Sequence, residues 1–368
     1  MYISQERVHF GSVDYSVKLY ESLTGLAEEL QAIAAISKVV VFTEKKIANI
    51  YGNELKQELE KSKLAYSFII LKGGERNKHI DRLKAIYNQL IDENVDRKSL
   101  VLAFGGGVVG DFAGYVAASY LRGVRFIQVP TTLLACVDSS VGGKVAVNVD
   151  RGKNMVGAFH QPSLVYAPLN TLETLPRREW RCGLAEVIKH SLLQGGEFFA
   201  KIQNFTKNDF QAKSELVEYS IRESVKFKAS IVEQDEKESG IRSVLNLGHT
   251  LGHAIESFTH YKKYSHGEAV AIGLVTALLL SQQVYALQPE ILKSVFSIYQ
   301  AIDMPYKEEI AAEELIMHMK HDKKTQNAVI RFVLLQELGK PTWNNEMQDE
   351  VLQKLIEKHW ELEVKDYT

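Results

Sequence analysis

Apolar and polar positions follow two different rhythms along the first half of the chain. Short β-branched runs are typical of buried strands at residues 38–43 (KVVVFT), 66–71 (YSFIIL), 99–104 (SLVLAF) and 124–130 (VRFIQVP). Between them lie amphipathic stretches with a helical period, such as residues 80–93 (IDRLKAIYNQLIDE). Strands that alternate with helices in this way predict a parallel sheet covered by helices on both faces.

The second half of the chain is dominated by helical patterns. Long examples are residues 210–234 (FQAKSELVEYSIRESVKFKASIVEQ) and 268–287 (EAVAIGLVTALLLSQQVYAL), and strand-like runs become rare beyond residue 176. A chain of 368 residues is also long enough for two hydrophobic cores. We therefore predict an α/β domain over residues 1–177 and a mostly α-helical domain over residues 178–368.

Composition narrows the class of protein without identifying it. A formal net charge of −2 gives no support to nucleic-acid binding. Two cysteines, Cys136 and Cys182, argue against a disulfide scaffold and suit a reducing cytosol. The N-terminus lacks the apolar core of a signal peptide, and the apolar run at residues 269–280 is too short to span a bilayer. We expect a soluble, cytoplasmic protein with no membrane partner.

A glycine-rich turn follows the strand at residues 99–104. Gly105, Gly107 and Gly110 fit the pattern G-x-G-x-x-G between a strand and a helix, where backbone N–H groups can approach a pyrophosphate. No carboxylate ends a strand about twenty residues later, as an ordinary Rossmann domain requires, but Glu44 ends an earlier one. A second turn, KGGERNK at residues 72–78, also follows a strand. The alternative is a turn that only packs a helix on the sheet.

Several basic residues lie among uncharged neighbours. Lys144 follows a Gly-Gly turn, Lys153 and Asn154 lie in a predicted loop, and Lys189 lies on a predicted helix with Glu186. Because burying an unpaired cation is costly, such residues suggest an anionic substrate that carries phosphate and carboxylate groups. Further candidates are Arg122, Lys228 and Arg242. Each one taken alone is equally compatible with a solvated surface cation.

Histidines and carboxylates offer candidate metal ligands. His249 and His253 are four residues apart, so a helix would place both imidazoles on one face. Glu186, Glu256 and His266 are further candidates. Spacing alone leaves open whether the pair His249 and His253 binds a metal, acts in catalysis or is satisfied by structural hydrogen bonds.

A resemblance joins these motifs. The segments 105–123 (GGGVVGDFAGYVAASYLRG), 129–148 (VPTTLLACVDSSVGGKVAVN), 152–162 (GKNMVGAFHQP), 183–190 (GLAEVIKH), 242–256 (RSVLNLGHTLGHAIE) and 264–273 (YSHGEAVAIG) resemble the 3-dehydroquinate synthase family. The resemblance covers nearly the whole chain, in order. It implies a Rossmann-like NAD-binding domain followed by a helical metal- and substrate-binding domain. It also implies one divalent metal, zinc or cobalt, and a homodimer.

The resemblance assigns roles to residues by motif position. The implied metal ligands are Glu186, His249 and His266. The implied cofactor contacts are Glu44, Gly73, Gly74, Glu75, Arg76, Asn77, Lys78, Gly107, Val108, Val109, Gly110, Asp111, Thr131, Thr132, Asp138, Lys144, Lys153, Thr171, Leu172, Glu173 and Thr174. The implied substrate contacts are Arg122, Lys144, Asn154, Lys189, Lys228, Arg242 and Asn246, and His253 and Glu238 are implied in proton transfer.

The implied reaction converts 3-deoxy-D-arabino-heptulosonate 7-phosphate to 3-dehydroquinate and phosphate. Two assignments are less specific than the others. Many members of the family have Asp at the position of Glu44, and either Lys323 or Lys324 matches a substrate contact of the family. Competing interpretations are another sugar phosphate cyclase, such as 2-deoxy-scyllo-inosose or 2-epi-5-epi-valiolone synthase, a metal-dependent polyol dehydrogenase, and a non-catalytic NAD-binding protein. The set of basic residues argues against a polyol dehydrogenase, which needs no phosphate clamp.

Overall fold

The computed structural model describes residues 1–10, 13–238, 240–321, 329–363 and 365. It divides into two compact units, Met1–Leu175 and Pro176–Thr368. The predicted boundary after residue 177 lies close to this division, whereas the roles predicted for the two domains stay predictions. Lys323 and Lys324 lie outside the described residues.

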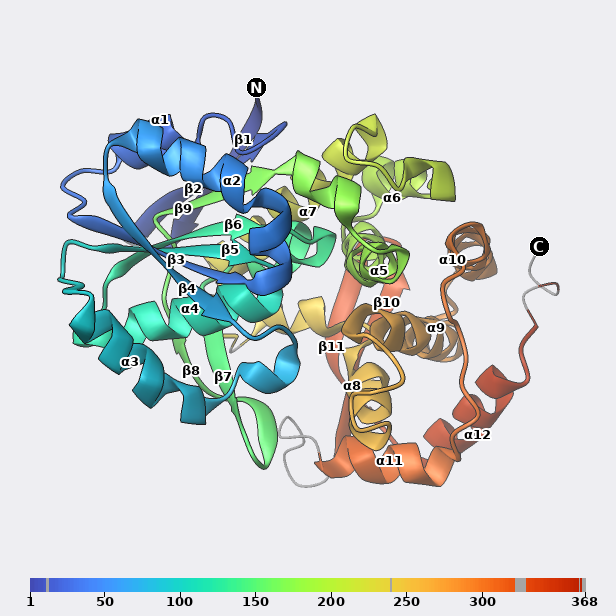
Figure 1. Ribbon diagram of the computed structural model, residues 1–368. Helices are drawn as coiled ribbons and strands as arrows, with labels where there is room; N and C mark the ends of the chain where they lie inside the picture. The colour runs from blue at the N-terminus through green and yellow to red at the C-terminus, as the bar shows by residue number, and fades with distance from the viewer. Residues whose placement is uncertain (11–12, 239, 322–328, 364, 366–368) are drawn as a thin grey trace. The chain divides into compact units, whose positions relative to one another are not determined.

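The first unit is built on a seven-stranded sheet with the order β1-β2-β9-β6-β5-β3-β4 (Figure 1). Its strands are β1 (Tyr2–Phe10), β2 (Val13–Tyr20), β3 (Lys38–Glu44), β4 (Ala65–Leu71), β5 (Leu100–Gly105), β6 (Arg125–Pro130) and β9 (Leu164–Pro168). All neighbours pair in parallel except β1 and β2. The predicted α/β class and its parallel sheet are confirmed.

Helices cover both faces of this sheet, as Figure 1 shows. They are α1 (Leu26–Ala32), α2 (Lys45–Ser62), α3 (Leu83–Asp92) and α4 (Gly107–Ser119). Successive residues of β3 point to opposite faces: Val39 and Val41 join the core under α1 and α2, whereas Val40 and Phe42 join the core under α3 and α4. Because both faces are buried, the strand has a continuous apolar run instead of an alternating one.

A two-stranded antiparallel ribbon, β7 (Lys144–Val149) and β8 (Gly152–Phe159), packs against α4. The predicted loop at Lys153 and Asn154 is therefore wrong, because both residues lie in β8. The sequence of β8 is rich in glycine and polar residues and lacks clear alternation, so its strand character comes from pairing with β7. Asn154 lies in the left-handed backbone region, with φ of 52°.

The glycine turn is shorter than predicted, because α4 already begins at Gly107. Gly110 and Asp111 therefore lie in the first helical turns instead of in a loop. A Cβ atom at Gly110 would lie 2.7 Å from Oε1 of Gln128 on β6, so a larger residue there would require the end of that glutamine side chain to move. The glycine thus leaves room for the side chain of Gln128 between α4 and β6.

The second unit is mostly helical. It comprises α5 (Arg177–Gln194), α6 (Gly196–Ile202), α7 (Glu215–Gln234), α8 (His249–Phe258), α9 (His266–Tyr285), α10 (Pro289–Ile302), α11 (Ala312–His321) and α12 (Asp349–Trp360), with an antiparallel pair β10 (Ile330–Glu337) and β11 (Lys340–Met347). Helix α9 packs against α5, α8, α10, α12 and β10. The predicted helical class of this part of the chain is confirmed.

Helix α9 is long and apolar enough to cross a membrane, but 83% of its most apolar window is buried inside the unit. Every residue from Gly267 to Ser281 is buried, so the helix is apolar on all sides because protein surrounds it. The apolar run at residues 269–280 therefore lies in a core helix of this unit.

Gly273 on α9 allows α8 to approach closely. A Cβ atom at Gly273 would lie 1.9 Å from the carbonyl oxygen of Gly248, the residue that caps α8 just before His249. We expect Gly273→Ala to lower the free energy of unfolding by about 1–3 kcal/mol, because the backbone of α8 must move. Thermal and urea unfolding followed by circular dichroism measure this change.

Gly52→Ala on α2 is the matched control, since its Cβ would meet only the Cβ of Ala48 at 3.9 Å. Alanine there should be neutral or raise stability by about 0.5–1 kcal/mol through helix propensity. Equal effects of the two substitutions would contradict the close-approach argument.

Candidate active site

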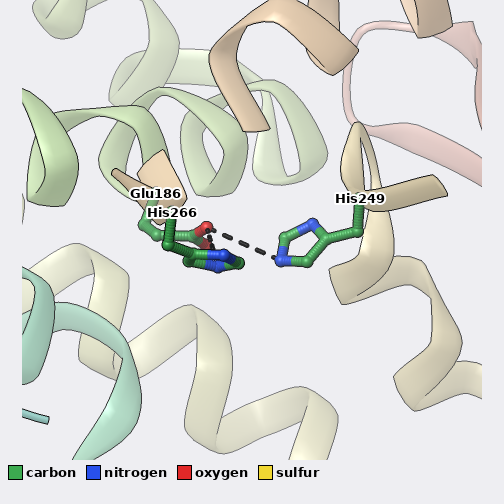
Figure 2. Close-up of side chains that lie close together, drawn as sticks. All are labelled: Glu186, His249 and His266. Carbon is green, nitrogen blue, oxygen red and sulfur yellow. Dashed lines mark ion pairs between the residues drawn. The ribbon is translucent and has the colours of Figure 1, made fainter. Parts of the chain in front are cut away.

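Three side chains from three helices of the second unit converge on one point. Glu186 lies in α5, and His249 and His266 are the first residues of α8 and α9. Nε2 of His249 lies 3.7 Å and Nε2 of His266 lies 3.8 Å from Oε1 of Glu186. Figure 2 shows both imidazoles directed at this carboxylate. The arrangement brings together one oxygen and two nitrogen donors, the set that a catalytic zinc site uses.

The environment of Glu186 supports a metal site. The side chain is fully buried, yet neither carboxylate oxygen accepts a hydrogen bond of ordinary geometry from the described residues. A buried carboxylate is costly unless cations compensate it. Lys189 supplies one positive charge at Oε2, whereas Oε1 faces the Nε2 atoms of the two histidines. Tetrahedral zinc, with bonds of about 2.0–2.1 Å, holds neighbouring donors about 3.4 Å apart, so small movements would complete the site.

Both histidines present Nε2 because Nδ1 is occupied elsewhere. Nδ1 of His249 lies 3.2 Å from the carbonyl oxygen of Leu247, and Nδ1 of His266 lies 3.1 Å from Oε2 of Glu256. Each acceptor favours the tautomer with hydrogen on Nδ1 and a lone pair on Nε2. Burial, together with the charge of Lys189 and the neighbouring histidines, holds the pKa of His249 well below its usual range. The imidazole is therefore in its neutral, metal-binding form.

Lys189 lies one helical turn beyond Glu186 and forms an ion pair with it. Only 1% of Lys189 is exposed, so its ammonium charge is held inside the protein next to the predicted ligands. A cation at this depth can receive an anionic or strongly polar group of a substrate. The position of Lys189 beside Glu186 agrees with the prediction that it lies at the site. A contact between Lys189 and substrate stays a prediction.

Other predicted substrate residues of this unit are buried near the end of α7. Lys228 on α7 is 6% exposed, and Arg242, in the short 3-10 segment Ile241–Asn246, is 2% exposed. Arg242 donates from Nη1 to the carbonyl of Glu236, and Nδ2 of Asn246 donates to Oε1 of Glu238 at 2.8 Å. This segment packs on both α5 and α7, so the structure brings these residues towards the helix that carries Glu186.

His253 lies one turn after His249 on α8, as the spacing predicted. Its ring centroid is 5.4 Å from that of His249 and 6.1 Å from that of His266. It forms a second possible group of ligands with Glu256 and His266, but not with Glu186. The two histidines therefore share a helix face without sharing all their neighbours.

In the first unit, several predicted cofactor residues meet at the carboxyl ends of the strands. Glu44 ends β3, the turn with Gly73 and Gly74 follows β4, and Gly107 begins α4 directly after β5. A Cβ atom at Gly73 would lie 3.0 Å from Oε2 of Glu44, so the Glu44 carboxylate lies against the turn after β4. From β3 the chain continues to β4 on one side, and from the adjacent β5 it continues to β6 on the other side, so the carboxyl ends of β3 and β5 form a topological switch point. Dinucleotides bind at such points.

Lys78 connects a predicted cofactor residue, Asp111, with a predicted substrate residue, Asn154. It is 3% exposed, forms an ion pair with Asp111 and donates to Oδ1 of Asn154 at 2.6 Å. Asn148 adds a second connection: its Nδ2 donates to Oε1 of Glu75 at 2.8 Å, and its Oδ1 accepts from the backbone N–H of Asn154 at 2.8 Å. Sequence analysis missed Asn148, because its role depends on the pairing of β7 and β8.

The remaining predicted cofactor residues differ in how accessible their side chains are. Val109, Thr131, Thr171 and Leu172 are at most 2% exposed, so any contact they make with a bound cofactor would involve little side-chain surface. Thr171 donates its hydroxyl to the carbonyl of Pro168. Residues with more accessible side chains include Arg76, Asn77, Val108, Thr132, Asp138, Lys144, Lys153, Glu173 and Thr174. Arg122 lies in the left-handed backbone region, with φ of 68°.

Comparisons with known proteins agree with these observations. Models of the 3-dehydroquinate synthase N-terminal and C-terminal regions match residues 68–182 and 183–325. The 3-dehydroquinate synthase of Leptospira interrogans is 54% identical over 342 residues, which are 93% of this chain and 94% of that protein. The enzyme of Thermoanaerobacter pseudethanolicus is 41% identical over 337 residues, which are 91% and 95% of the two chains.

A solved structure shares the fold. The 2-epi-5-epi-valiolone synthase of Streptomyces hygroscopicus, solved with NAD⁺ and Zn²⁺ bound, has a TM-score of 0.86 at 22% identity and covers 95% of this chain and 98% of that one. At this identity the likeness concerns the fold alone. The identities to the Leptospira and Thermoanaerobacter enzymes extend over nearly the whole chain, and they confirm the resemblance found in the motifs. The chain belongs to the 3-dehydroquinate synthase family.

Proposed function

We propose that the chain converts 3-deoxy-D-arabino-heptulosonate 7-phosphate to 3-dehydroquinate and phosphate, with NAD and one divalent metal as cofactors. Membership of the family supports the reaction. The observation that carries the metal is the group of Glu186, His249 and His266 around a buried carboxylate without ordinary hydrogen bonds. The NAD site is supported by the switch point at the ends of β3 and β5.

Glu186, His249 and His266 would hold the metal, which when bound supplies Lewis-acid polarisation of the vicinal hydroxyls of the sugar. The carboxylate and the two neutral imidazoles together carry one negative charge, so a dication keeps a net positive charge towards the substrate. Burial of Glu186 excludes water from one side of the site. In such surroundings electrostatic stabilisation of a developing alkoxide is stronger than in water.

Residues around Glu44, Gly73 to Lys78 and Gly107 to Asp111 would hold NAD, which supplies reversible hydride transfer at C5 and is regenerated in each turnover. The temporary ketone at C5 acidifies the proton at C6, and loss of that proton expels phosphate by β-elimination. After the ketone is reduced again, the sugar ring opens and an intramolecular aldol step closes the carbocycle. No net oxidation results.

The basic residues would position the anionic groups of the substrate. We assign Arg122, Lys144, Asn154, Lys189, Lys228, Arg242 and Asn246 to its phosphate, carboxylate and hydroxyl groups. Burial of Lys189, Lys228 and Arg242 supports this assignment, because each carries its charge into the interior. Groups fixed in advance hold phosphate in line with the breaking bonds, and such positioning supplies much of the rate. His253 and Glu238 are assigned to proton transfer.

A phosphate-release assay tests the reaction. We expect the protein to release phosphate from heptulosonate phosphate with NAD present at catalytic amounts, to lose this activity on chelation, and to regain it with Zn²⁺ or Co²⁺. The same assay on glucose 6-phosphate and sedoheptulose 7-phosphate tests for the other sugar phosphate cyclases. Accumulation of NADH in proportion to substrate would instead indicate a polyol dehydrogenase, and absence of turnover on all substrates would contradict catalysis.

The same proposal extends to the setting of the enzyme. We place it in the cytoplasm as a homodimer without nucleic-acid or membrane partners. The composition supports this setting, with a formal net charge of −2 and two cysteines, both of them free and buried. Analytical ultracentrifugation of the metal- and NAD-loaded protein measures the mass of the particle, and a monomer would contradict the dimer.

A further inference from the structure

We infer that Glu256 is a positioning residue that orients His266 and thereby sets the affinity of the metal site. This inference rests on the proposed metal site of Glu186, His249 and His266. Oε2 of Glu256 lies 3.1 Å from Nδ1 of His266, while Nε2 of the same ring faces Oε1 of Glu186 at 3.8 Å. The two carboxylates therefore meet opposite edges of one imidazole.

The contact between the Glu256 carboxylate and Nδ1 selects one of the two tautomers of His266. An ionised carboxylate can only accept a hydrogen bond, so Nδ1 must carry the hydrogen and Nε2 keeps its lone pair for the metal. Acceptance of that hydrogen bond also raises the basicity of the ring as a ligand. His266 needs this support more than a core residue would, since it is the first residue of α9 and its side chain is about one third exposed.

Glu256 is buried, and its backbone is fixed by a hydrogen bond. It lies near the end of α8, is 6% exposed, and its carbonyl oxygen accepts the backbone N–H of Tyr261 at 2.8 Å. Helices α8 and α9 pack closely where Gly252 of α8 meets the backbone of α9 at Ala269. The acceptor and the ring it orients are thus carried by two helices whose backbones are in close contact.

A competing role for Glu256 is that of a metal ligand, because Glu256, His253 and His266 also form a group of three possible donors. The contact with Nδ1 argues against this role at the proposed site. One ion bound at Nε2 cannot also be reached from the Nδ1 edge of the same ring. Glu256 would bind metal only if the ion moved away from Nε2 of His266 and from Oε1 of Glu186, which faces that nitrogen at 3.8 Å.

Metal affinity measured by competition with a chromophoric chelator tests the inference. We expect Glu256→Gln to weaken Zn²⁺ binding about 10-fold and Glu256→Asp, which withdraws the carboxylate by one methylene, to weaken it within a range of about 10- to 100-fold. The control is Glu308→Gln, since Glu308 is an equally buried carboxylate of this unit that accepts from Lys263 at 2.8 Å. The control should bind Zn²⁺ as the unaltered protein does.

The visible spectrum of the Co²⁺-loaded protein separates positioning from ligation. If Glu256 only orients His266, the Glu256→Gln variant keeps the band positions and intensity of the unaltered protein, because its three ligands are unchanged. A change as large as that of His266→Ala would overturn the inference in favour of a ligand. In a His266→Ala background, Glu256→Gln should cause no further loss of affinity, and an additive loss would also overturn it.

Failure of this inference is distinct from failure of the proposed function. If the unaltered protein binds no stoichiometric metal, the proposed site is wrong. If it binds metal and both Glu256 variants bind equally well, only the positioning role is wrong. Thermal unfolding of the metal-free variants, compared with Glu308→Gln, shows whether a loss of affinity comes merely from a less stable second unit.

Discussion

Replacement of His266 by alanine is expected to remove the bound metal and to lower phosphate release by about a thousandfold or more. The remaining donors, Glu186 and His249, would leave the ion with two protein ligands instead of three. Lewis-acid stabilisation of a developing alkoxide contributes several kcal/mol, and each 1.4 kcal/mol changes the rate about tenfold. Metal content by inductively coupled plasma spectrometry and the phosphate-release assay measure the two effects.

His318→Ala is the control for this experiment. His318 is a histidine of the same unit whose Nδ1 lies 3.0 Å from Oγ of Ser257, and its ring lies against Phe258. Its loss removes the same atoms without touching the three proposed ligands, so metal content and turnover should stay close to those of the unaltered protein. If His266→Ala kept its metal and full phosphate release, the ligand assignment would be wrong.

Sequence patterns predicted β3, β5 and β6 because these central strands are buried on both faces. Residues 38–43 form a continuous apolar run, and Val39 and Val40 indeed belong to opposite cores. The edge hairpin of β1 and β2 and the ribbon of β7 and β8 were missed. Every residue of strand β8 is partly or fully exposed, so no buried face leaves an apolar pattern in its sequence. Such strands depend on their pairing partners, which local sequence does not reveal.

At the candidate site, too, local sequence predicted the helix but not the contacts between distant segments. Helical spacing correctly predicted that His249 and His253 lie on one helix. Spacing left the ligands undecided, because Glu186 comes from α5 and His266 from the start of α9. Only the packing of three helices brings these donors within 4.8 Å of one another. Glu256 was one candidate ligand among several in the sequence, and its hydrogen bond to Nδ1 of His266 suggests a different role.

His253→Ala is expected to keep the metal and to lower turnover by about 10²–10⁴-fold. His253 lies next to the proposed ligands, with its ring 5.4 Å from that of His249, but it does not share the carboxylate of Glu186. Loss of a group that transfers a proton in the transition state has an effect of this size. Metal content, kcat for phosphate release and partial rescue of kcat by added imidazole are the measurements.

His249→Ala gives the matched comparison, since it removes the same side chain one helical turn earlier on α8. We expect this variant to lose metal, because Nε2 of His249 faces Glu186 at 3.7 Å, and imidazole should not restore its turnover without added metal. Metal loss from His253→Ala as large as that from His249→Ala would contradict the division of roles. It would mean that one face of α8 supplies two ligands, and that Glu186 and His266 are not sufficient partners for His249.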